Sequence, residues 1–257
     1  VKGIYKHYEE ACLNDSLVDF AEMKLELDKI KLPAIKIVLT GSGKVAKGAK
    51  EIVDHLNIEK VTVEEYLTKT YQKAVYCYID VMDYNKKIDG GAFNKTEFFK
   101  DPIGYESNFM RFAKVSNVLI AGHFYGENAP YLFTRDDAKQ PEFHISVIGD
   151  ISCDIDGPVA STLRASTIAD PIYGYQAASE KEVPFKTKNS ITVMAVDNLP
   201  CELPKDASEG FGSMFFNQVM PAFFNNDKDG ILERAKITTS KGTLTKRFSY
   251  LKDYIED

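Results

Sequence analysis

The clearest change of hydrophobic pattern along the chain lies between residues 35 and 56. Residues 35–39 are almost continuously apolar, which is typical of a parallel strand covered on both faces. Beyond two glycines, apolar residues recur at helical spacing, at Val45, Ala49, Ile52, Val53 and Leu56. This order predicts a strand, a tight loop and then a helix.

Further strands and helices are predicted along the rest of the chain. Short apolar runs predict strands at 61–63, 74–78, 118–122, 144–152 and 191–196. A capped short helix is expected at 133–138. A longer helix opens at 206 and is expected to pack inward through Ala207, Phe211, Met214, Phe215 and Val219. The stretch 68–112 is irregular beyond its strand, so it is interpreted as a functional or mobile insertion.

Two helices are predicted before the first strand. Residues 4–12 place Ile4, Tyr8, Ala11 and Cys12 on one helical face. Residues 14–16, Asn-Asp-Ser, then predict a stop and a new N-cap, followed by a second helix that ends by Pro33.

The loop between the first strand and its helix carries candidate chemistry. Gly41 and Gly43 lie between a strand and a helix, where free backbone N–H groups can hold a pyrophosphate. An acid at the end of the next strand, Glu64 or Glu65, is expected to bind the adenosine ribose. The pattern predicts a dinucleotide site in an α/β, Rossmann-type, doubly wound parallel sheet with a C-terminal helical tail. The alternatives are a glycine-rich loop of another doubly wound protein and an S-adenosylmethionine site of a methyltransferase.

The composition of the chain limits the classes of partner that it is expected to bind. The chain has 257 residues and a net charge of −6, so it lacks the basic surplus of a nucleic-acid-binding protein. No apolar run is long enough to span a membrane. The four cysteines are scattered singly, which predicts reduced, structural thiols in a cytoplasmic protein. No metal site is expected, because the acids Asp150, Asp154 and Asp156 lack the closing glutamate of a calcium loop.

Several ordered blocks resemble one family. From Ile35 to Tyr254 the chain is similar to the lysine-ketoglutarate reductase and saccharopine dehydrogenase group, relatives of alanine dehydrogenase, and most similar to the reductase half of the aminoadipic semialdehyde synthases. The blocks are GSGKVAKGA (41–49), YESNF (105–109), NAPYLFTRDDA (128–138), GDISCDIDG (149–157), AVDNLP (195–200), LPKDASE (203–209) and ITTSKGTL (237–244). Together they are far more specific than the glycine loop alone.

The resemblance implies roles for individual residues. Cofactor-binding residues would be Gly41, Gly43, Lys44, Val45, Glu65, Tyr125, Val196, Asp197, Asn198 and Leu199. Among these, the turn at Gly43 touches the pyrophosphate, Glu65 faces the ribose and Tyr125 lies beside the cofactor. Asp197 also acts as an electrostatic helper at the nicotinamide end. Ile151 would approach the bound amino acid.

The resemblance also implies a reaction and a division into domains. Lysine and 2-oxoglutarate condense to an imine, and hydride transfer from NADH or NADPH gives saccharopine. The family's lysine and histidine acid/base pair lies in an N-terminal domain, so the catalytic residues of this chain stay unknown. The chain is expected to be a fragment that binds cofactor but does not turn over alone. The expected parts are a helical linker (1–33), a dinucleotide-binding domain (34–225) and a tail returning toward the missing domain (226–257).

Several alternatives stay open at this level. An acid at the ribose favours NAD, whereas Lys44 and Lys69 offset repulsion of a 2′-phosphate, so the choice between NAD and NADP is unresolved. His123 follows a strand and is either a proton shuttle or, more commonly for this placement, a structural residue. The chain as a whole is either an oxidoreductase module or a non-catalytic dinucleotide-sensing or interaction module. The oligomeric state is open, with a homo-oligomer among the options.

Overall fold

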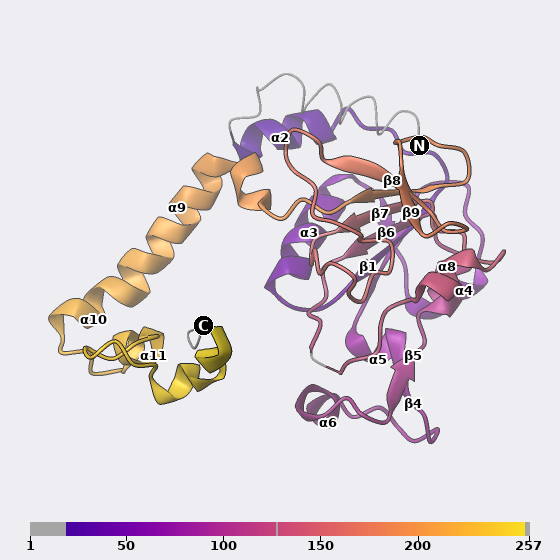
Figure 1. Cartoon of the computed structure of the whole chain (residues 1–257). Helices are drawn as coiled ribbons and strands as arrows, with labels where there is room; N and C mark the ends of the chain where they lie inside the picture. The colour runs from indigo at the N-terminus through magenta and orange to yellow at the C-terminus, as the bar shows by residue number, and fades with distance from the viewer. Residues whose placement is uncertain (1–18, 127, 255–257) are drawn as a thin grey trace. The chain divides into compact units, whose positions relative to one another are not determined.

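The computed structural model describes residues 19–126 and 128–254 (Figure 1). The chain forms two compact units, Val1–Glu202 and Leu203–Asp257. The first contains the whole sheet, and the second is helical. The second unit begins earlier than the predicted tail at 226, and the functional domain limits stay a prediction.

A single eight-stranded sheet organises the first unit. Its strand order is β2-β3-β1-β6-β7-β10-β8-β9. The bounds are β1 (Lys36–Thr40), β2 (Glu59–Lys60), β3 (Val75–Ile79), β6 (Val118–Ala121), β7 (Val147–Asp150), β8 (Ile172–Gln176), β9 (Lys181–Val183) and β10 (Ile191–Met194). The pairs from β2 to β10 are parallel, whereas β8 and β9 join as an antiparallel edge. The predicted α/β fold with a mostly parallel sheet is confirmed.

The central strand β1 is buried on both faces, as its apolar run predicts. Val38 faces a large core that includes Leu119, Ile148 and Val193. Ile37 points the other way, into a smaller core that includes Val53 of the following helix. Successive side chains of β1 thus pack into two different cores, one on each face of the sheet. This packing requires a nearly continuous apolar sequence.

The helices of the first unit are mostly short. They are α2 (Phe20–Leu27), α3 (Lys44–His55), α4 (Val63–Thr68), α5 (Val81–Tyr84), α6 (Lys95–Lys100), α7 (Met110–Ala113), α8 (Arg135–Lys139) and the 3₁₀ turn η1 (Leu199–Glu202). Helix α3 packs Val53 into the smaller core, while α4 packs Tyr66 into the larger one, and Figure 1 shows them on opposite sides of the sheet. Among the described residues, no helix is long and apolar enough to cross a membrane.

Within the irregular stretch 68–112, residues 85–107 form a small ordered layer beyond β3. Strands β4 (Asn85–Lys87) and β5 (Tyr105–Ser107) pair antiparallel and flank α6. The rings of Phe93, Phe98 and Tyr105 lie with their centroids 5.1 to 5.3 Å apart, and the last two are buried. This aromatic cluster fixes α6 against the hairpin.

Two local expectations are wrong or incomplete, and one pair of strands was not expected. Residues 61–63 do not form a strand, because Thr62 caps α4 instead. The predicted strand at 144–152 is confined to β7. The antiparallel hairpin of β8 and β9 was not expected from the sequence, and it extends the parallel sheet at one edge.

The helical unit begins with a long helical run. Its elements are α9 (Pro204–Met214), the π-helical turn η2 (Phe215–Val219), α10 (Met220–Phe224), α11 (Ile231–Ala235) and the 3₁₀ segment η3 (Lys246–Tyr254). The helix predicted from 206 is confirmed, but its inward packing is wrong. Phe211 and Met214 are 67% and 53% exposed. Phe215 and Phe216 of η2 are exposed as well, whereas α10 buries Ala222.

Some N-terminal expectations lie outside the described residues. They are the helix over 4–12, with Cys12 on its face, and the N-cap at 14–16. Helix α2 begins after Asp19, whose side chain accepts a hydrogen bond from the Glu22 amide at 3.1 Å. The helix ends at Leu27, well before Pro33. Among the described cysteines, Cys77, Cys153 and Cys201 are free thiols, of which Cys77 is buried and Cys201 is exposed.

Candidate dinucleotide site

All of the predicted site residues except Glu65 lie in segments that follow the carboxyl ends of parallel strands. Thr40 at the end of β1 pairs with Ile79 of β3 on one side and with Ala121 of β6 on the other. Ala121 in turn pairs with Asp150 of β7. The loops that follow β1, β3, β6 and β7 therefore leave the sheet at one edge, where doubly wound proteins bind ligands.

The turn after β1 requires its first glycine. Gly41 is buried and has a φ of +100°, and a Cβ there would stand 2.6 Å from the carbonyl oxygen of Gly122. A Cβ on Gly122 would itself lie 3.1 Å from the Cα of Ala46. These small residues let the β1 turn, the β6 loop and helix α3 approach one another closely. Backbone therefore packs directly against backbone behind the turn.

Helix α3 presents an open N-terminus. Gly43 is its N-cap and makes no side-chain cap, and a Cβ at this position would meet no atom within 4 Å. The first turn has no acidic residue, and Lys44 and Val45 are exposed. The uncapped amides and the helix dipole favour an anion here. The buried Gly41 turn and the open space at Gly43 fit the pyrophosphate of a dinucleotide.

Asp80 occupies the position at which doubly wound sheets place a ribose-binding acid. It follows β3, the immediate neighbour of β1, and its Oδ1 accepts hydrogen bonds from Ser42 Oγ at 2.9 Å and the Val81 amide at 2.7 Å. Its Oδ2 accepts one from Lys95 Nζ at 2.7 Å. Partial burial opposes ionisation, but these donors together hold the pKa of Asp80 below its ordinary value. The carboxylate is thus charged and linked to the glycine turn.

Glu65, the acid expected at the ribose, lies elsewhere. It is in the first turn of α4, where it accepts from Thr62 and pairs with Lys69 at 2.9 Å. Lys69 and Thr62 lower the pKa of Glu65 to about 2. The carbonyl of Lys69 accepts from Lys36 Nζ at 2.8 Å, and Lys36 begins β1. Helix α4 therefore lies toward the amino edge of the sheet, and Glu65 is not brought to the glycine turn.

His123 is buried behind the site. It is 6% exposed, and its Nδ1 lies 2.8 Å from Thr40 Oγ1. Its ring packs against Tyr84 with centroids 5.6 Å apart. Burial lowers the pKa of His123 to about 4, although the charge of Asp150 opposes this. The neutral, enclosed imidazole supports the structural interpretation of this histidine over the proton shuttle.

Asp150, at the end of β7, is fully buried and anchors the following loop. Its Oδ1 accepts from Ser152 Oγ at 2.5 Å and from the Cys153 amide at 3.2 Å, while Oδ2 accepts from Thr162 Oγ1 at 2.6 Å. Ile151 is half-buried, and its amide donates to the carbonyl of Ala121 at 2.9 Å. The loop that carries Ile151 is therefore fixed at the same edge as the glycine turn.

The segment after β10 reaches this edge as well. Cys153 Sγ donates to the carbonyl of Ala195 at 3.0 Å, which ties the β7 loop to the β10 loop. Burial raises the pKa of Cys153, and the charges of Asp150 and Asp197 raise it further. Asp197 and Asn198 are exposed, Val196 is buried and Leu199 is half-buried. The 196–199 segment thus offers backbone and an exposed carboxylate beside the β7 loop.

Tyr125 lies in the loop after β6 and is half-buried. Its ring meets Tyr131 edge to face, with centroids 5.8 Å apart. Tyr131 donates to the carbonyl of Asp156 at 3.2 Å. The ring of Tyr125 is therefore held on the β6 loop.

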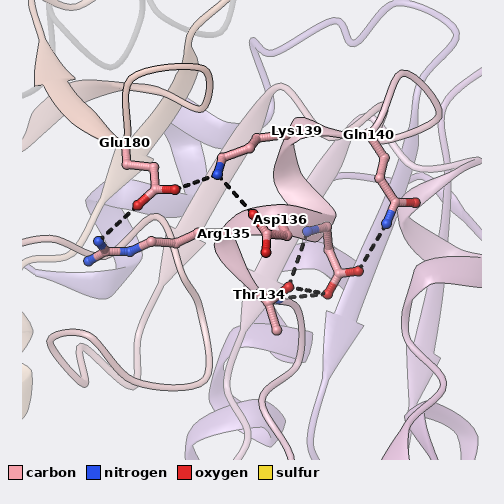
Figure 2. A network of polar contacts seen from close by, with 7 residues as sticks. Thr134, Arg135, Asp136, Lys139, Gln140 and Glu180 are labelled. Carbon is pink, nitrogen blue, oxygen red and sulfur yellow. Dashed lines mark hydrogen bonds and ion pairs between the residues drawn. The ribbon is translucent and has the colours of Figure 1, made fainter.

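Helix α8 is tied to the β8–β9 hairpin by charged side chains (Figure 2). Glu180 pairs with Arg135 at 3.2 Å and with Lys139 at 2.5 Å. Arg135 also pairs with Asp156 at 2.6 Å, at the edge of a cavity of about 270 Å³. Because Arg135 already has two carboxylate partners, we interpret this network as structural.

Comparisons with known proteins agree with the resemblance seen in the sequence. The chain is 28% identical over 260 residues to the mitochondrial alpha-aminoadipic semialdehyde synthase of Mus musculus, covering 90% of this chain and 28% of that protein. The Bos taurus protein of the same name is 26% identical, covering 92% and 29%. The Arabidopsis thaliana alpha-aminoadipic semialdehyde synthase is 27% identical, covering 83% and 22%. No family model matches the chain.

These matches confirm the expected resemblance, but they cover only part of each relative. The chain spans less than a third of the length of the curated relatives it matches. The mammalian names include the word mitochondrial, so the predicted cytoplasmic location is not confirmed.

Proposed function

We propose that this chain is the nicotinamide-dinucleotide-binding part of an amino-acid oxidoreductase that interconverts lysine plus 2-oxoglutarate and saccharopine. The activity would be that of a lysine-forming saccharopine dehydrogenase, or lysine-ketoglutarate reductase. One observation carries the proposal: the buried Gly41 turn opens onto the uncapped N-terminus of α3, with Asp80 bonded to Ser42 beside it. The similarity to aminoadipic semialdehyde synthases supplies the substrate class.

Each part of the dinucleotide has a proposed position. The amides of Gly43, Lys44 and Val45 would hold the pyrophosphate, and Asp80 would accept hydrogen bonds from the adenosine ribose. Tyr125 would lie beside the cofactor. When bound, the nicotinamide supplies the hydride donor or acceptor.

The nicotinamide end would be lined by the backbone of 196–199. Asp197 is exposed there and would tune the local charge. Ile151, on the neighbouring β7 loop, would approach the amino-acid substrate. The link from Cys153 to the carbonyl of Ala195 keeps these two loops together, which favours alignment of two reactants.

The acid/base groups of the reaction are proposed to come from another domain of the same protein. His123 is neutral and buried, and the buried carboxylate of Asp150 accepts hydrogen bonds from four neighbouring donor groups. Neither is placed to exchange a proton with a substrate at neutral pH. The chain alone is therefore expected to bind NADH or NADPH without turnover of lysine and 2-oxoglutarate.

The same burial of His123 and Asp150 favours a second function, a non-catalytic module that senses the dinucleotide. The two proposals make different predictions for a polypeptide in which this chain is joined to a domain that carries the acid/base pair. Dinucleotide-dependent saccharopine formation by that protein supports the oxidoreductase. Binding without turnover supports the sensor.

Titration of the purified chain with NADH and NADPH, followed by nicotinamide fluorescence and calorimetry, tests the shared premise. A Gly43→Leu variant should lose binding, because its side chain would fill the open space at the helix N-terminus. Gly48→Leu is the matched control, since position 48 is in the same helix, also has open space, and lies away from the N-terminus. Equal affinity of both variants and the parent chain would refute the loop assignment.

A further inference from the structure

The layer formed by residues 85–107 reaches the candidate ribose acid. Lys95 is the first residue of α6, and its Nζ lies 2.7 Å from Asp80 Oδ2. Helix α6 is fixed by the buried cluster of Phe98 and Tyr105. A segment far from the glycine turn in sequence therefore delivers a cation to the carboxyl end of β3.

Other lysines of this layer have other acidic partners. Lys87 pairs with Glu97 at 2.9 Å, and Lys86 pairs with Glu106 at 3.0 Å. Lys95 pairs with the acid that also accepts from Ser42 in the glycine turn. The Asp80–Lys95 pair thus belongs to the candidate site, whereas the pairs of Lys86 and Lys87 belong to the layer itself.

The Asp80–Lys95 ion pair bears on the choice between NADH and NADPH, because it alters the charge near the 2′ position of the ribose. A bare carboxylate at the end of the strand accepts from a ribose 2′-hydroxyl and repels a 2′-phosphate. Here a lysine neutralises that carboxylate, and its side chain remains 45% exposed. A flexible, exposed ammonium group can move from a carboxylate to a nearby phosphate, because its four-carbon stem rotates freely.

We propose that Lys95 is the residue that admits the 2′-phosphate, so that this chain binds NADPH as well as NADH. Asp80 would serve the 2′-hydroxyl of NADH with Lys95 as its counter-ion. Lys95 would turn toward the 2′-phosphate of NADPH and shield it from Asp80. This inference rests on the proposed dinucleotide site and adds the residue that sets its specificity.

Dissociation constants for NADPH, NADH, adenosine 2′,5′-bisphosphate and ADP, measured by fluorescence and calorimetry, test the assignment. Lys95→Ala should raise the dissociation constants of NADPH and the bisphosphate by about tenfold or more, which is the usual scale for one charged hydrogen bond. The dissociation constants of NADH and ADP should change by less than about threefold, because their adenosine ribose carries no 2′-phosphate. The two short nucleotides separate the 2′-phosphate effect from any effect at the nicotinamide.

Two control variants make the result specific. Lys86→Ala removes a lysine of the same layer that pairs with Glu106, and all four affinities should stay unchanged. Lys44→Ala, at the N-terminus of α3, should weaken the binding of NADPH and of NADH by similar factors, because both molecules carry the pyrophosphate. An unchanged ratio of NADPH to NADH affinity in Lys95→Ala would contradict the role of Lys95. A parent chain that binds neither dinucleotide would instead refute the proposed function.

Discussion

The backbone of Gly41 lies so close to Gly122 that a Cβ at position 41 would stand 2.6 Å from the Gly122 carbonyl oxygen. Gly41 also has a φ of +100°, which strains any residue with a side chain. The turn that opens the candidate site is therefore specified sterically, by contact between the loops after β1 and β6.

Gly41→Ala should lower the free energy of unfolding by about 1 to 3 kcal/mol, because it combines backbone strain with a clash against backbone. Gly43→Ala should change it by less than about 1 kcal/mol, since position 43 has a negative φ and open space. Urea titration followed by tyrosine fluorescence measures both. Equal loss in the two variants would contradict the close contact with Gly122.

Asp80→Asn should weaken the binding of NADH by about tenfold, because the charged group that accepts a hydrogen bond from the ribose hydroxyl becomes neutral. Asparagine keeps an oxygen that can accept from the Val81 amide, so α5 should remain capped. Glu65→Gln is the matched control, and NADH affinity should not change, because Glu65 lies at the N-terminus of α4. Fluorescence titration measures both affinities. A loss of NADH affinity in Glu65→Gln but not in Asp80→Asn would instead indicate that Glu65 binds the ribose.

The difference between Asp80 and Glu65 shows where sequence reasoning succeeds and fails. The strand, glycine turn and helix from Ile35 to Leu56 depend on local patterns, and the structure has them as β1 and α3. The usual spacing places the acid about 20 residues later. The inserted β2 and α4 move the true neighbour of β1 to Val75–Ile79, so the acid that follows is Asp80. Strand adjacency is a non-local property that spacing alone does not reveal.

A local signal in the sequence does identify the structural role of Glu65. Thr62 and Glu65 have the spacing of a capping box, and both of its hydrogen bonds form in the structure. That signature predicts a helix start rather than a strand end, and it assigns Glu65 a structural partner. The exposure of Phe211 was not predictable in the same way, because helical spacing indicates an apolar face without showing what covers it.

His123 should make stability depend on pH. Burial lowers its pKa to about 4, whereas an unfolded histidine has its ordinary pKa of about 6.5. Between these values the unfolded chain binds the extra proton, so stability rises with pH through this window and is lost as pH falls toward 4. The full contribution is at most about 3 kcal/mol.

The free energy of unfolding of the parent chain should therefore fall more steeply between pH 6.5 and 4 than that of His123→Gln. His144→Gln, at an exposed histidine, should follow the parent. Should His123→Gln fail to fold, the imidazole proton resonance of His123 in the parent chain gives the same information. A midpoint near 6.5 in that NMR titration would contradict the buried, neutral state.

The three described thiols should differ in reactivity. Cys201 is exposed, so it should react rapidly with an aromatic disulfide reagent at neutral pH. Burial raises the pKa of Cys77 to about 12 and also raises that of Cys153, which donates to the carbonyl of Ala195. Thiolates are the reacting species, so both should be modified much more slowly. Mass spectrometry of peptides from a timed reaction measures each site separately. Rapid modification of Cys153 would show that the hydrogen bond joining the β7 and β10 loops opens readily, and it would remove the support for a fixed nicotinamide end.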